Sequence, residues 1–277
     1  MKESVITVSD MHINSTMGLC RPGLYKDDGN ELTLNVVQKW LFPTWERFLD
    51  EALAYTEGTH RNLVLVGDIG DCDLKDRSLQ LMSKNNADML NMACETLEPL
   101  VNACDTSFMI RGTEAHTGQS NWLEEAIASN FNMEMDDSRK AYSWWTLRAI
   151  FGGVNFDIAH HTSMGGMFHT YANAAMKLAY TTMQEYWDWG DTPPDVVVRA
   201  HNHRWADSGT TFDTRAFCLP AWQWKTAYLN RLGKMNVRPH IGSMAFLCDD
   251  GEYTFKSFRY RPKRESVWTR DSQMTSI

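Results

Sequence analysis

Two histidines one residue apart, His201 and His203, follow an apolar run in the stretch VRAHNHRW. A comparable pair, Asp10 and His12, follows the apolar run near the start of the chain. Imidazole and carboxylate without thiolate favour Zn, Mn, Fe, Ni or Co, whereas calcium demands mostly oxygen ligands. Because residues two apart on an extended backbone point to the same side, each pair is predicted to present two donors in one direction.

Five clusters of ligand-type side chains follow five apolar runs. The clusters are SDMHIN with Asp10 and His12, VGDIGD with Asp68 and Asp71, RGTEAH with Glu114 and His116, AHHTS with His160 and His161, and AHNHR with His201 and His203. Taken singly, each is typical of a turn or cap at a strand end. In an open α/β fold, however, the carboxyl ends of the strands converge on one crevice. Together, the clusters therefore predict a single site.

As an ordered set, the clusters resemble the motifs of the calcineurin-like metallophosphoesterase superfamily, which run Asp-x-His, Gly-Asp-x-x-Asp, Gly-Asn-His-Glu/Asp, His and Gly-His-x-His. The resemblance covers residues 5–204. It implies an α/β fold of four layers, with two facing mixed β-sheets flanked by α-helices. It also implies two divalent metal ions (Mn, Zn, Fe or Ni) and hydrolysis of phosphate mono- or diesters. The compact chain and its third motif resemble phage-encoded members in particular.

The resemblance assigns a role to each matching side chain. Asp71 would be a nearby structural or catalytic acid, and the family usually takes the first histidine of a pair such as His160 and His161. Along an extended strand these two histidines would point to opposite faces. The metal ligands implied are Asp10, His12 and His203 for the first ion, Asp68 as the bridging carboxylate, and His160 and His201 for the second ion.

The third motif departs from the family pattern, because GTEAH lacks the asparagine that provides the amide ligand of the second ion. Three alternatives are open: Glu114 supplies an oxygen, His116 becomes a ligand, or the second ion keeps an additional water. His116 is equally a candidate for the family histidine that interacts with the leaving-group side of the phosphate. In the last motif, Ala200 and Asn202 replace the usual glycine and threonine.

The expected mechanism uses an activated water and no protein nucleophile. Two cations about 3.5 to 4 Å apart can clamp a phosphate and lower the pKa of a bridging water to near neutrality, which makes hydroxide available. His116 would stabilise the departing oxygen, and Arg111 and Arg204, which lie beside the motifs, would balance the phosphate charge. For both arginines the alternative is a surface ion pair.

Strands alternating with helices are predicted to position these clusters. The strands are expected at 4–10, 62–68, 107–112, 154–161 and 195–201, and the helices at 32–55, with Pro43 as a kink or break, and at 78–103. Residues 162–194 are expected to form a lid-like insertion with a helix ending near Trp187. The alternation predicts an α/β architecture.

The segment from Gly242 to Tyr260 differs from the strand-and-helix pattern before it. Two runs in which apolar and polar residues alternate flank an Asp-Asp-Gly turn. This pattern predicts a β-hairpin and suggests a second, more antiparallel sheet. We expect one domain over residues 1–262 and a loose tail over 263–277.

The net charge, the cysteine content and the absence of long apolar runs limit the kinds of partner and location expected for the chain. A formal charge of −8 and a pI of about 5.6 disfavour a surface built to bind nucleic acid along its length. Six scattered cysteines, no leader-like start and no long apolar run favour a reduced, cytoplasmic protein that does not span a membrane. The expected partner is a phosphate ester, in one interpretation nucleotide-like. A nuclease and a non-catalytic interaction scaffold of the same fold are the alternatives.

Overall fold

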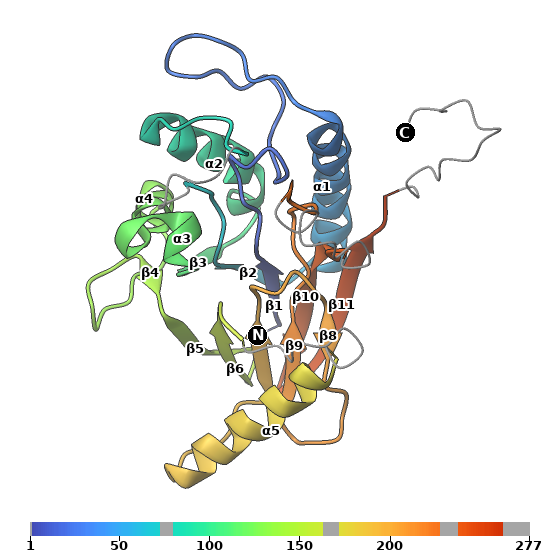
Figure 1. Ribbon diagram of the computed structural model, residues 1–277. Helices are drawn as coiled ribbons and strands as arrows, with labels where there is room; N and C mark the ends of the chain where they lie inside the picture. The colour runs from blue at the N-terminus through green and yellow to red at the C-terminus, as the bar shows by residue number, and fades with distance from the viewer. Residues whose placement is uncertain (1, 73–79, 163–171, 228–237, 263–277) are drawn as a thin grey trace, which may run out of the picture.

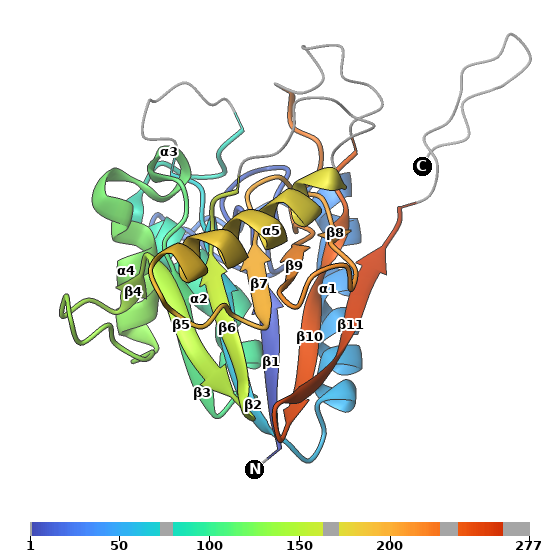
Figure 2. The same cartoon turned by 90° about the horizontal axis from the view of Figure 1, so that it is seen from below.

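Two β-sheets lie face to face between layers of helices in the computed structural model, which describes residues 2–72, 80–162, 172–227 and 238–262 (Figures 1 and 2). The expected α/β fold of four layers is confirmed. The first sheet has the order β11-β10-β1-β2-β3-β4. Its strands are β1 (Glu3–Val8), β2 (His60–Val66), β3 (Thr106–Ile110), β4 (Ser143–Trp144), β10 (Ile241–Asp249) and β11 (Glu252–Tyr260).

The second sheet has the order β5-β6-β7-β9-β8 and mixes parallel and antiparallel pairs. Its strands are β5 (Thr146–Phe151), β6 (Val154–Ala159), β7 (Val196–Arg199), β8 (Ala206–Asp207) and β9 (Arg215–Cys218). Apolar side chains from both sheets fill the space between them, among them Val64, Phe156 and Phe246. The opposite face of the first sheet packs on helices, so its central strands are buried on both faces and read as continuous apolar runs.

Helix α1 (Val36–Tyr55) begins at a capping box, in which the Asn35 side chain accepts from the N–H of Gln38 and the Gln38 side chain accepts from the N–H of Asn35. The helix buries its predicted apolar face against the first sheet. The expected break at Pro43 is wrong, because the helix continues through this residue. Packing of Trp45 and the apolar positions around it outweighs the single backbone hydrogen bond that proline cannot donate.

Helix α2 (Asn86–Val101) begins later than residue 78, where the sequence placed its start. Asn85 caps it by accepting a hydrogen bond from the N–H of Ala87, and residues 80–85 form a turn that bonds to Asn14 instead. The short α3 (Glu114–Thr117), the 3-10 turn η1 (Gln119–Asn121) and α4 (Trp122–Asn130) follow β3. They place the third motif at the carboxyl end of the first sheet.

The C-terminal hairpin is present, with its turn at Asp250, but it does not start a separate sheet. Strand β10 pairs antiparallel with β1, so the hairpin extends the first sheet. The second sheet is built instead from residues between the third and last motifs and just beyond them. The sequence pattern identified the hairpin correctly but could not identify its partner strand.

Helix α5 (Asn173–Asp188) crosses the outer face of the second sheet (Figure 2). Ala179 packs against Val197 and Ala216, whereas Met176 and Trp187 on the same helix are exposed. The lid over residues 162–194 stays a prediction, and both 163–171 and the expected tail 263–277 lie outside the described residues.

All six cysteines lie in the described part of the chain, and no disulfide joins them. Among the described residues, none of the helices has the length and apolar character that crossing a membrane requires. The cytoplasmic location stays a prediction.

Candidate metal centre

The loops that carry the predicted ligands adopt left-handed backbone conformations. The φ angles are 49° at Asp10, 45° at His12, 52° at Asp68, 71° at His201 and 54° at His203. Residues other than glycine adopt such angles rarely, at a cost of about 1 to 3 kcal/mol each, and they concentrate at functional sites. The expectation that each pair lies on extended backbone is therefore wrong, since both strands end before the pair begins. The pairs converge because the loops turn sharply.

The first group of ligand atoms comes from the loop after β1 and from the loop after β7. Nε2 of His12 lies 3.3 Å from Nε2 of His203, which in turn lies 3.2 Å from Oδ1 of Asp10. The ligand atoms of these three residues all fall within 4.8 Å of one another. The structure thus brings together the three side chains that the resemblance gave to the first ion.

The second group surrounds Asp68 at the end of β2. Oδ2 of Asp68 lies 3.1 Å from Nε2 of His160 and 4.0 Å from Nδ1 of His201. Oδ1 accepts a hydrogen bond of 2.6 Å from the N–H of Thr113. Asp10, Asp68 and His160 also form one set of close ligand atoms, so the two groups are adjacent.

His160 is fixed in the orientation that a ligand needs. Its Nδ1 lies 2.7 Å from the carbonyl oxygen of Val66 and donates to it, so Nε2, which faces Asp68, is the nitrogen that binds a metal ion once its proton is lost. The ring packs directly on Gly67, where an added Cβ would lie 2.5 Å from Nδ1 and where φ is 75°. Only glycine fits this close approach without strain.

His161 lies on the same side as His160. The two ring centroids are 4.8 Å apart, and His161, His160 and His201 form one further set of close ligand atoms. Strand alternation does not separate the two histidines, because β6 ends at Ala159. The sequence analysis applied the alternation of side chains in a strand to His160 and His161, which both lie beyond the end of β6.

His116 joins the first group and not the second. Its Nδ1 lies 3.3 Å from Oδ1 of Asp71, and its ring meets that of His12 edge-on at 4.6 Å. Oδ2 of Asp71 lies 3.8 Å from Nδ1 of His12. Asp71 therefore links two imidazoles, and these three residues form another set of close ligand atoms.

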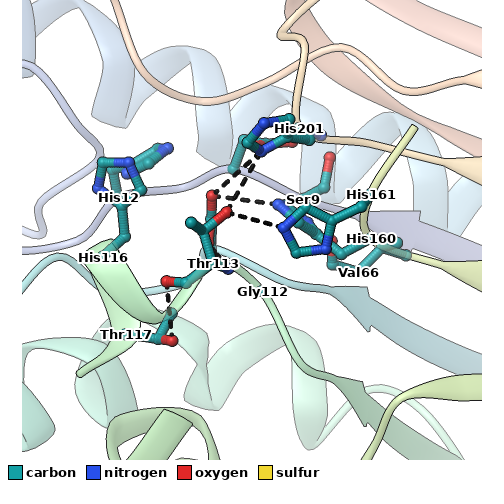
Figure 3. Close-up of polar contacts among 12 residues, drawn as sticks. Ser9, His12, Val66, Gly112, Thr113, His116, Thr117, His160, His161 and His201 are labelled. Carbon is teal, nitrogen blue, oxygen red and sulfur yellow. Dashed lines mark hydrogen bonds and ion pairs between the residues drawn. The ribbon is translucent and has the colours of Figure 1, made fainter. Parts of the chain in front are cut away.

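Glu114, the first sequence alternative for the missing amide, is exposed and accepts a hydrogen bond from the N–H of Ser120. It belongs to none of the close ligand sets in the described residues. The prediction that Glu114 is a ligand is thus not supported, because α3 begins at this residue and carries its side chain toward the following turn. Thr113, one position earlier, lies between His161 and His201 (Figure 3).

The two arginines differ. Nε of Arg111 donates to Ser143, its guanidinium lies 3.6 Å from Glu125, and it stacks over the ring of Trp145. Its charge is engaged as in the ion-pair alternative. Arg204 follows His203 and contributes, after burial, to lowering the pKa of His240.

Several buried ligand atoms have no hydrogen-bond partner in the described structure: Asp10 Oδ1, His12 Nδ1 and His160 Nε2. An unpaired buried polar group costs about 1 to 3 kcal/mol. Two of these atoms still face an ion-pair partner, His160 Nε2 at 3.1 Å from Asp68 and Asp10 Oδ1 at 3.2 Å from His203. Buried carboxylate and imidazole donors of this kind are typical of a transition-metal site. The residues present therefore fit divalent ions of the Zn, Mn, Fe or Ni type.

Burial and charge act against each other here. Burial would lower the pKa of His160, but the nearby Asp68 carboxylate raises it to about 10. Burial would raise the pKa of Asp71, but hydrogen bonds from His116 and His12 lower it to about 2. For His12 burial dominates and lowers the pKa. A dense group of acids and imidazoles with opposed pKa shifts is typical of a functional site.

Glu124 is a site residue that sequence reasoning missed. It is fully buried in α4 and accepts hydrogen bonds from the N–H groups of Ile69, at 3.3 Å, and Gly112, at 2.7 Å. These residues lie beside Asp68 and Thr113, so one carboxyl group ties the second motif to the third. In the sequence Glu124 is an ordinary acidic residue in the first turn of a helix, and no motif marks it.

No family model matches the chain, and no curated protein matches it. Solved structures with a similar path of the backbone include Vps29 of Entamoeba histolytica complexed with Zn²⁺, at 14% sequence identity and a TM-score of 0.45 over 92% of each chain. A hypothetical protein of Pyrococcus horikoshii OT3 has 12% identity and a TM-score of 0.42 over 94% of this chain and 90% of its own. Vps29 of Chaetomium thermophilum has 10% identity and a TM-score of 0.37 over 93% and 96%. These likenesses carry no conclusion about function, and they give no support to a phage origin.

Proposed function

We propose that this chain is a metal-dependent phosphoesterase that hydrolyses phosphate mono- or diesters with two divalent ions. The observation that carries the proposal is the meeting of two acid and imidazole groups at the carboxyl ends of both sheets, including three buried ligand atoms that make no hydrogen bond. A purely structural cluster would satisfy these atoms by hydrogen bonds.

Each ion has a defined set of side chains. Asp10, His12 and His203 would hold the first ion, and Asp68, His160 and His201 the second. When bound, the ions supply Lewis acidity, which polarises the phosphate and activates water near neutral pH. The remaining chemistry falls to the protein.

His116 is proposed to act on the leaving-group side. Its side chain is 39% exposed, and Asp71 holds Nδ1, which leaves Nε2 for the ester oxygen. Burial would lower the pKa of His116, but the hydrogen bond with Asp71 and the nearby acids raise it overall. A raised pKa favours the proton-donating form of the imidazole, which a general acid requires. The competing role, that of a ligand beside His12 and Asp71, remains open to experiment.

Arg204 is the proposed contact for the phosphate charge. Its positive charge acts on His240, together with those of Arg259 and Arg261, so several cations gather beside the loop of His203. The chain as a whole is acidic, with a net charge of −8. A local positive region in an acidic protein favours a small anionic ester over a long nucleic acid.

The decisive test compares p-nitrophenyl phosphate with bis-p-nitrophenyl phosphate as substrates for chelator-treated protein, resupplied with Mn²⁺, Ni²⁺ or Zn²⁺. Turnover of the first substrate indicates a monoesterase and of the second a diesterase. Two bound ions without turnover of either substrate would favour a scaffold. Salt-sensitive binding and cleavage of single-stranded DNA would favour a nuclease.

A further inference from the structure

We propose that His161 is a ligand of the second metal ion and takes the place of the amide ligand that the third motif lacks. The ion would then be held by three imidazoles, those of His160, His161 and His201 (Figure 3), together with the carboxylate of Asp68. This inference rests on the proposed function, because it assumes that a second ion binds. It makes the site specific to this chain and not a copy of the family pattern.

The three rings surround one point. Their centroids are 4.8 Å apart for His160 and His161, 5.3 Å for His160 and His201, and 5.0 Å for His161 and His201. Their ligand nitrogens all lie within 4.8 Å of one another. Nitrogens that share one ion at about 2.0 to 2.1 Å lie at most about 4.2 Å apart. Only a small contraction is needed for all three to bind one ion.

The end of β6 allows both neighbours to take part. Within a strand, His160 and His161 would face opposite ways, but the strand stops at Ala159. His160 is 1% exposed and forms the floor of the group, whereas His161 is exposed and covers it from the solvent side. The two rings stand nearly perpendicular, at 89°, so their nitrogens approach the same point from different directions.

The other candidates for the missing ligand lie elsewhere. Glu114 bonds to Ser120, and His116 bonds to Asp71 beside the first group. Of the three alternatives that the sequence left open, neither protein side chain reaches the second group in the described residues. His161, set aside in the sequence argument in favour of its neighbour, does reach it.

Thr113 supports this arrangement. It occupies the position of the absent asparagine, and its hydroxyl lies 3.3 Å from Nε2 of His161 and 3.3 Å from Nδ1 of His201. Distances of 3.3 Å between the hydroxyl oxygen and the two ring nitrogens fit a hydroxyl that either binds the same ion or donates a hydrogen bond to one of its ligands. The threonine side chain is shorter than asparagine and offers only a neutral hydroxyl, whereas an imidazole is a strong donor to Zn, Ni or Co. The second site should therefore prefer these ions to Mn²⁺ or Mg²⁺.

The test measures metal content and affinity. Wild-type protein and the His161→Ala, Thr113→Val and His60→Ala variants would be stripped with chelator and titrated with Zn²⁺ and Co²⁺, with elemental analysis after gel filtration. His60 is the matched control, because it is a half-exposed histidine that bonds to Thr106, away from the site. Circular dichroism confirms that each variant folds, which is expected for an exposed position such as His161.

We expect two ions in wild type and in His60→Ala. In His161→Ala the first ion should stay, and the affinity for the second should fall by about 10- to 100-fold or more, the range seen even for groups that only support a ligand. The visible spectrum of bound Co²⁺ should change as one imidazole is lost. These readouts do not depend on turnover.

The outcomes separate the two proposals. If wild type binds two ions and hydrolyses esters while His161→Ala keeps the second ion at unchanged affinity, the role of His161 is refuted and the proposed function stands. If only Thr113→Val loses the second ion, the hydroxyl fills the position and the inference is equally refuted. A wild type that never takes up a second ion overturns both proposals.

Discussion

The carboxylate of Asp10 accepts a hydrogen bond from the backbone N–H of His201, a residue 191 positions further along the chain. The bond is 3.1 Å long and uses Oδ2, which leaves Oδ1 directed at Nε2 of His203, 3.2 Å away. One side chain thus joins the end of the first strand to the end of β7 and aims a ligand atom at the same time. The protein itself holds the ligands in place before an ion arrives.

Asp68→Asn should abolish metal retention and turnover together. Asp68 lies between the two ligand groups, and an amide there removes a charge that balances the ions. We expect activity to fall roughly a thousandfold or more, because metal ions supply several kcal/mol of stabilisation. Elemental analysis and ester hydrolysis check this. Asp137→Asn, at an exposed carboxylate, is the control, and full turnover in Asp68→Asn would count against the assignment.

His116→Ala should slow turnover by about 100-fold or more while both ions remain bound, as expected for loss of a general acid. Asp71→Asn should have a smaller effect on the rate and should shift the high-pH limb of the rate profile downward, because Asp71 helps to raise the pKa of His116. Rates over pH and metal content are measured on the same samples. If His116→Ala loses an ion and keeps its rate per bound ion, His116 is a ligand instead.

Binding of the second ion should release about one proton near pH 7. In the metal-free protein the pKa of His160 is raised to about 10, mainly by Asp68 against the effect of burial, so the imidazole is protonated and must lose its proton to bind metal. The apparent affinity should therefore increase with pH up to that range. Calorimetry in buffers of different ionisation enthalpy counts the protons. His12, whose pKa is lowered by burial, provides the comparison, since the first ion should displace fewer protons.

Glu124→Gln should flatten the pH dependence of stability in metal-free protein. Burial, followed by the charge of Asp68, raises the pKa of Glu124 from 4.5 to about 8. A carboxyl group with a raised folded pKa stabilises the protein fully below pH 4.5, and that contribution is lost as the pH rises toward 8. The difference is on the order of 5 kcal/mol.

Urea unfolding at pH 5 and pH 8.5, in the presence of chelator, measures this difference between wild type and Glu124→Gln. Glu125→Gln is the adjacent control, because hydrogen bonds from Ser143 and Tyr142 lower the pKa of Glu125 despite burial. Because the folded pKa is lowered, the ionised Glu125 stabilises the protein at neutral pH, and the stability difference between wild type and Glu125→Gln should disappear only as the pH falls. Parallel pH curves for wild type and Glu124→Gln would refute the prediction.

The sequence predicted which acids and imidazoles would lie close together, because the chemistry of these side chains and the order of the strands leave few arrangements. Acids and imidazoles after successive strands must meet when those strands are parallel neighbours, as β1 and β2 are. The backbone conformation that directs these side chains toward one another was not predictable from the sequence. Asp10 and His12 point to a common site through left-handed loops, and such conformations depend on tertiary contacts such as the bond from His201 to Asp10.

Three other features escaped prediction for similar reasons. Glu124 accepts hydrogen bonds from backbone N–H groups, which every residue type except proline carries, so no sequence motif indicates its role. His161 lies beside His160 because β6 ends two residues earlier than the pattern indicated. The pairing of β10 with β1 joins segments more than 230 residues apart, and alternation within a strand carries no information about its neighbour.

This last pairing has a consequence for how the chain is made. β1 precedes the other described strands along the chain, yet it lies between β2 and β10 in the finished sheet. Until residue 249 has left the ribosome, one edge of β1 exposes unpaired backbone groups, together with the apolar side chains that flank them. A nascent chain of this protein must therefore spend most of its translation with an open edge, and folding has to wait for contacts of long sequence separation, which form slowly. Late completion of the first sheet follows from the strand order itself.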